Sequence, residues 1–180
     1  MIVAALAVLN GCAVATGQDA AREEPGAVVE LPRVTELRTN CAGAHLEGVV
    51  WAVEQWERAV PSLELGITLA ETELNLMCVD VPELPRSEST PGGILLGNTA
   101  IDSPRRVELY AHDMPYPDQL LPLVALHELG HFLTRNVAHH EPGRLMATVP
   151  DTDAPACIST EDLEWFCRSF PCDGRERATC

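Results

Sequence analysis

The sequence predicts an α/β (α+β) fold built on one twisted, mixed β-sheet. Two segments, 43–60 and a stretch that begins near Asp118, have the apolar spacing of helices. Short β-like runs lie between them, separated by turns rich in proline and glycine. The order strand, helix, strands, edge segment, strand, helix favours one sheet covered by helices. With 180 residues, of which 46% are hydrophobic, the chain is long enough for one domain with its own core.

The first elements are expected to be a short strand and a long helix. Residues 13–40 combine charges with two prolines, which is typical of a tether, and a short strand is expected at their end. In the segment 43–60, apolar residues such as Val49 and Trp56 fall on one face of a helix. Pro61 then ends this helix.

The central strands are expected to be short. Strands are predicted at 65–70, 74–81 and 107–111, and an extended edge segment at 94–101. The prolines and glycines of 82–93 predict a loop before the edge segment. The second helix is rich in apolar residues, among them Leu120, Leu121, Val124, Leu126, Leu129, Phe132 and Leu133.

The charge balance argues against two classes of partner. The formal net charge is −15, and all 12 basic residues are arginine. Nucleic acids and anionic lipid surfaces repel such a chain, so neither is an expected partner. Any membrane contact is expected only through a lipid at the N-terminus.

The N-terminus is typical of an exported protein. Residues 2–9 form an apolar run too short to span a membrane, followed by small residues, as in a secretory signal. Leu9-Asn10-Gly11-Cys12 resembles a bacterial lipobox, in which the cysteine is lipidated and becomes the new N-terminus. We therefore expect a signal peptide over 1–12 and an outer-membrane, periplasmic or cell-surface lipoprotein. The alternative is cleavage after Ala15 and secretion.

The cysteine count favours disulfides. Without Cys12, the seven cysteines become six (7 − 1), an even number that suits three disulfides in an oxidising compartment. Four of these six lie between residues 157 and 180, so the C-terminal tail is expected to be cross-linked. A zinc site made of cysteines is the lesser alternative, because the sequence contains no CxxC pair.

The stretch 127–146 carries the candidate chemistry. It opens with an intact HExxH motif made by His127, Glu128 and His131. On a helix, histidines four residues apart lie on one face and can bind one Zn²⁺, the expected cofactor. Glu128 borders that face, where it could take a proton from a zinc-bound water and pass it to the leaving amine. A catalytic zinc also needs a third protein ligand and one open position.

With this motif the chain resembles the metzincin clan of zinc peptidases, most closely its small bacterial matrixin-like members. The clan pattern is HExxHxxGxxH followed by a Met-turn, and Arg144-Leu145-Met146-Ala147 resembles that turn. The resemblance implies a zincin-like fold with a long first helix, an HExxH zinc helix and a C-terminal helix beginning near Ser159. Ser159 and Asp162 have the spacing of a capping box, with an aspartate variant, at the start of that helix. It implies a catalytic domain over 41–180, although its specific part is 127–146.

The chain departs from the pattern after His131. Thr134 and Val137 stand where the clan has its glycine and third histidine. Asn136 is the expected left-handed residue that ends the helix. His139 is the expected third zinc ligand, because it keeps more nearly the usual distance to the Met-turn, and His140 is the alternative.

A different zinc peptidase class takes its third ligand as a glutamate on a later helix. Glu161 and Glu164 lie at suitable sequence distances for such a gluzincin site. A simpler role for Glu161 is an acid in the first turn of a helix, which the helix dipole favours. The histidines and the methionine make this the lesser hypothesis.

These observations predict a zinc-dependent endopeptidase, a hydrolase that acts on protein or peptide substrates and is expected to be a monomer. In metzincins an extended substrate pairs with the edge strand of the cleft, here the segment 93–101. The alternative is a catalytically inactive metzincin-like surface lipoprotein that serves as a binding module. A purely structural disulfide-linked lipoprotein ranks last, because it treats the HExxH motif as accidental.

Overall fold

A computed structural model of the protein describes residues 34–81, 83–85, 96–102, 104–111, 114, 117–139, 145–147 and 156–180. The expected signal peptide over 1–12, the lipid site at Cys12 and the alternative ligand His140 lie outside these residues.

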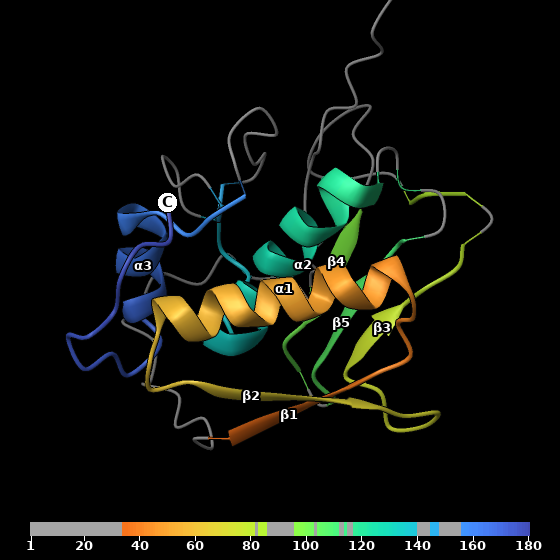
Figure 1. Ribbon diagram of the computed structural model, residues 1–180, viewed down its shortest axis with the longest axis horizontal. Coiled ribbons are helices and arrows are strands. Elements are labelled where there is room, and N and C mark those ends of the chain that lie inside the picture. Colours follow the sequence, from red (N-terminus) through yellow and green to blue (C-terminus); the bar gives the residue numbers. More distant parts are fainter. Residues whose placement is uncertain are drawn as a thin grey trace, which may run out of the picture.

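The described strands form one mixed five-stranded sheet in the order β2-β1-β3-β5-β4 (Figure 1). β4 and β5 are antiparallel, and the other neighbours are parallel, which confirms the predicted mixed sheet. The short strand expected at the end of 13–40 is β1, and it pairs on both sides. The strands are β1 (Val34–Thr39), β2 (Glu64–Leu69), β3 (Leu76–Cys78), β4 (Gly97–Ala100) and β5 (Arg106–Leu109).

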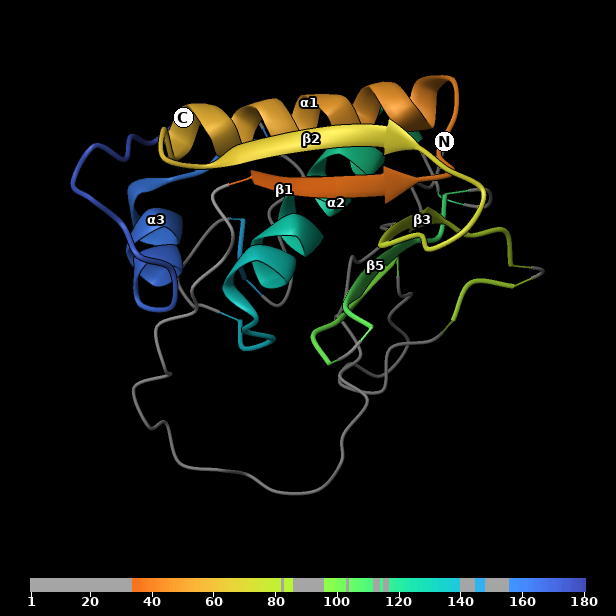
Figure 2. The same cartoon turned by 90° about the horizontal axis from the view of Figure 1, so that it is seen from below.

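Three helices complete the described fold: α1 (Ala44–Ala59), α2 (Pro117–Thr134) and α3 (Thr160–Cys167). α1 packs against α2 and contacts β2, while α2 contacts β4 and β5. Figure 2 shows α1 running along β2, with α3 near the other end of the domain from β3. The fold class is therefore mixed α/β, as expected. Among the described residues, no helix is both long and apolar enough to cross a membrane.

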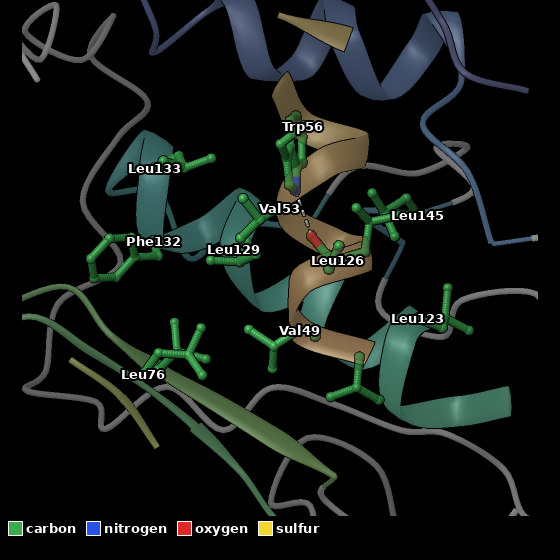
Figure 3. Close-up of a cluster of buried hydrophobic side chains, with 14 of the residues drawn as sticks. Val49, Val53, Trp56, Leu76, Leu123, Leu126, Leu129, Phe132, Leu133 and Leu145 are labelled. Carbon is green, nitrogen blue, oxygen red and sulfur yellow. Dashed lines mark hydrogen bonds between the residues drawn. The ribbon is translucent and has the colours of Figure 1, made fainter. Parts of the chain in front are cut away.

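Trp56 connects the three helices at the centre of the core. Its side chain is fully buried on α1, and its indole N–H donates a 2.8 Å hydrogen bond to the Leu126 carbonyl on α2 (Figure 3). The same ring stacks on Phe166 of α3 with 4.7 Å between centroids. α1 and α2 also approach closely at Gly48, where a Cβ atom would lie 2.7 Å from Leu121 Cδ2. Trp56 and Gly48 thus determine how closely α1 packs against α2.

Three disulfides cross-link the domain, as the cysteine count predicted. Cys41–Cys78 joins the chain after β1 to β3. Cys157–Cys180 and Cys167–Cys172 lie in the C-terminal tail, which confirms that this tail is cross-linked. Because their sulfurs are bonded to each other, Cys167 and Cys172 cannot act as thiolate ligands beside Glu176, although the three side chains lie close together.

Replacing Trp56 should destabilise the domain strongly. We expect Trp56→Phe to lower the free energy of unfolding by about 2 kcal/mol or more, because it opens a cavity and removes a buried hydrogen bond. Urea unfolding followed by circular dichroism measures this. Trp51→Phe on the same helix is the matched control, and its half-buried ring should cost less than about 1 kcal/mol. Equal losses for the two variants would contradict the central role of Trp56.

Candidate metal centre

The helix α2 buries the three motif residues of the HExxH sequence. His127, Glu128 and His131 are 5%, 2% and 0% exposed. The helix is apolar around its circumference, so it lies in the core and carries these polar groups with it. Buried polar side chains need partners from the surrounding structure.

The structure brings three histidines together. The ligand nitrogens of His127, His131 and His139 lie within 4.8 Å of one another. The His127 and His131 Nε2 atoms are 3.1 Å apart. Two zinc–nitrogen bonds of about 2.0–2.1 Å at a tetrahedral angle would separate their nitrogens by roughly 3.4 Å. The pair is thus spaced for one small cation.

Hydrogen bonds at the far side of each ring set the tautomers. His127 Nδ1 donates to the Leu145 carbonyl and His131 Nδ1 to the Asn136 carbonyl, both at 2.6 Å. A carbonyl can only accept, so each Nδ1 carries the proton and each neutral ring keeps a lone pair on Nε2. The two Nε2 lone pairs therefore face each other across 3.1 Å.

Burial keeps these rings neutral. It lowers the pKa of His127 to about 4, and burial together with the neighbouring His127 ring holds the pKa of His131 well below its ordinary value. Zinc binds the neutral imidazole. Both rings are therefore in the protonation state that a metal ligand needs at neutral pH.

His139 closes the cluster from outside the helix. Its ring centroid lies 5.4 Å from that of His127 and 5.1 Å from that of His131. The Nε2 atom of His139 is buried, although the residue as a whole is only half-buried. The residue expected as third ligand thus lies beside the other two.

The turn that leads to His139 differs from the prediction at one residue. Arg135, with φ of 52°, adopts the left-handed conformation, so the prediction of Asn136 for that position is wrong. Asn136 makes two other interactions instead. Its side-chain oxygen accepts a 2.9 Å hydrogen bond from the Ala138 N–H, and its carbonyl orients His131. An asparagine side chain is well suited to stabilise such a local turn, because it can accept a hydrogen bond from the backbone two residues further on.

A buried aspartate on α3 holds the segment that orients His127. Asp162 is fully buried and accepts hydrogen bonds from the backbone N–H groups of Leu145 and Met146 at 3.0–3.2 Å. It also completes the predicted capping box with Ser159. Because the Leu145 carbonyl orients His127, Asp162 acts on the cluster through one intervening residue. The capping spacing was visible in the sequence, but this second role was not.

Met146 packs against α2 at Gly130. A Cβ atom at Gly130 would lie 2.7 Å from Met146 Sδ and 3.0 Å from the Trp56 ring. Met146 is fully buried there. The glycine inside the motif therefore makes room for the segment that carries the Leu145 carbonyl.

The buried Glu128 side chain packs against β4. The Thr99 hydroxyl lies 2.5 Å from Glu128 Oε2, and a Cβ atom at Gly97 would lie 2.8 Å from Glu128 Cγ. No pattern in the sequence indicated Thr99, because its partner is 29 residues away.

The other candidates lie outside this cluster. Glu161 and Glu164 are exposed on α3, and the described metal-ligand group that includes the HExxH histidines contains neither of them. Tyr110 donates to Glu108 Oε2 over 3.3 Å. Burial, aided by the charge of Glu108, raises the pKa of Tyr110 to about 12, so this phenol stays protonated.

No family model and no curated protein matches this chain.

His139 and His140 can be distinguished by a matched pair of substitutions. We expect His139→Ala to weaken zinc binding by more than the ~10–100-fold that loss of an outer partner costs, because it removes a ligand. We expect His140→Ala to bind zinc as the unsubstituted protein does. Competition with a chromophoric chelator measures both affinities. The reverse order would assign the third ligand to His140.

Proposed function

We propose that the protein is a zinc-dependent endopeptidase of the metzincin type. The observation that supports it most directly is the pair of facing lone pairs on His127 and His131, 3.1 Å apart. A cation bound by both nitrogens would account for this close approach of two acceptors. His139 would supply the third ligand, and three protein ligands leave the open position that a catalytic zinc needs.

The donor set fits zinc better than a hard cation. All three side chains offer imidazole nitrogen, whereas Ca²⁺ and Mg²⁺ prefer oxygen ligands. The Nδ1 hydrogen bonds to two backbone carbonyls also match the outer partners that orient zinc-bound histidines. When bound, zinc would polarise a peptide carbonyl and lower the pKa of a coordinated water.

Glu128 would move the proton during hydrolysis. It follows His127 directly on α2, and its carboxylate accepts a hydrogen bond from Thr99 on β4. As general base it takes a proton from the attacking water while the new C–O bond forms. As general acid it returns that proton to the amide nitrogen when the C–N bond breaks. The products are a carboxylate and an amine, and no further reactant is required.

The sheet edge supports a peptide substrate. Among the described strands, β4 is the last of the sheet and pairs only with β5. An extended peptide could hydrogen-bond to the outer side of such a strand. Because Thr99 of β4 contacts Glu128, a peptide bound there would pass beside the proposed general base.

We also propose that the protein is exported. The three disulfides fit an oxidising compartment. The lipobox-like sequence at Cys12 suggests attachment to a membrane by a lipid.

Two further features support the metzincin type. The Leu145–Ala147 segment contacts His127 of α2, and α3 begins with a capping box.

A binding module is the second candidate, and the altered turn at Arg135 favours it. If the lengthened turn lets His140 bind zinc in addition to His139, four protein ligands would close the site. Such a site could hold zinc without catalysing hydrolysis.

A proteolysis assay with a matched variant tests the proposed function. We expect the purified protein to cleave an unfolded, quenched-fluorescent protein, and a chelator to abolish the activity until zinc is added back. Glu128→Gln should retain zinc and lose at least ~100-fold in kcat, because it cannot accept the proton. If zinc is bound and both proteins are silent, the binding module is the better interpretation.

A further inference from the structure

We propose that Thr99 on β4 is a positioning residue for Glu128. This inference rests on the proposed function and adds a residue to it. Thr99 is 6% exposed, and its hydroxyl lies 2.5 Å from Glu128 Oε2 and 3.1 Å from the Glu128 carbonyl. A hydroxyl has one proton, and the shorter contact takes it. A separation of about 2.5–2.7 Å is typical of a hydroxyl that donates to a carboxylate.

The register of β4 places a second constraint on the same side chain. Gly97 and Thr99 are two residues apart, so they face the same side of the sheet, and both are buried. A Cβ atom at Gly97 would lie 2.8 Å from Glu128 Cγ and 2.9 Å from Oε1. The glutamate side chain therefore packs on the bare backbone at Gly97 and accepts from the hydroxyl at Thr99.

These contacts restrict a side chain that is otherwise flexible. A glutamate has three rotatable torsions, and a catalytic carboxylate must be held close to its productive position. Threonine is suited to hold it, because its branched Cβ limits the hydroxyl to few orientations. The Thr99 hydroxyl contacts Glu128, whereas a peptide at the sheet edge would hydrogen-bond to the backbone of β4. The hydroxyl therefore acts on the reaction only through Glu128, which is why Thr99 is a positioning residue and not a catalytic one.

Kinetics of threonine variants test this role in the whole protein. Thr99→Val keeps the shape of the side chain and removes the donor. We expect kcat to fall about 10-fold with KM unchanged within twofold, since the hydrogen bond serves the reacting carboxylate and not substrate binding. Thr99→Ser restores the hydroxyl and should recover most of kcat. Thr99→Ala serves as a second variant without the donor should the valine fold poorly.

Thr39→Val is the matched control, since Thr39 is a fully buried threonine on β1, away from Glu128. It should leave kcat unchanged even if it lowers stability. An unchanged kcat in both donor-less Thr99 variants overturns the proposal. So does a kcat in Thr99→Ser as low as in Thr99→Val.

A second readout does not need activity. Urea midpoints are measured for zinc-free Thr99→Val, Glu128→Ala and the double variant. We expect the double variant to lose less stability than the sum of the two single losses, because both remove one interaction. If the unsubstituted protein proves inactive, the proposed function fails, and this cycle alone decides the role of Thr99. Additive losses would then overturn it, and non-additive losses would support it.

Discussion

The burial of polar groups on α2 is the constraint on which the rest of the site depends. His127, Glu128 and His131 are at most 5% exposed on a helix that is otherwise apolar. Leaving one such group without a hydrogen bond costs about 1–3 kcal/mol, a large part of the stability of a small domain. Each finds a partner on a different segment: the chain at 145–147, β4, and the turn after α2. The hydrogen bonds that these three side chains require therefore bring the three segments together around α2.

The same constraint makes α3 part of the site. Asp162 caps α3 and at the same time accepts from the backbone of Leu145, whose carbonyl holds His127. Trp165 on α3 places its ring edge-on to His131, with centroids 5.8 Å apart. The Cys157–Cys180 disulfide joins the segment just before α3 to the C-terminal tail. This disulfide thus helps to fix α3, which supports the histidine cluster through Asp162 and Trp165.

What could be predicted from the sequence was local. The helix over 43–60 and the capping box at Ser159 follow from periodicity and from residues a few positions apart, and the mixed sheet follows from the order of such locally predicted elements. The contacts of Thr99 and Asp162 could not be predicted, because each partner lies 16 to 29 residues away and no motif joins them. The left-handed residue was placed at Asn136 from its intrinsic tolerance alone. In the structure Asn136 instead hydrogen-bonds to the Ala138 N–H and to His131 Nδ1, and Arg135 adopts the left-handed conformation.

The lengthened turn explains how His139 can still reach the histidine pair. In the HExxHxxGxxH pattern a glycine turns the chain after the helix. Here Thr134 stands at that position and continues the helix, and its hydroxyl donates a 2.7 Å hydrogen bond to the Gly130 carbonyl. Arg135 then takes the left-handed conformation, at a cost of about 1–2 kcal/mol for a residue with a Cβ. The two hydrogen bonds of Asn136 offset a cost of that size, at about 1 kcal/mol each. The turn is thus moved by one residue without separating the third histidine from the other two.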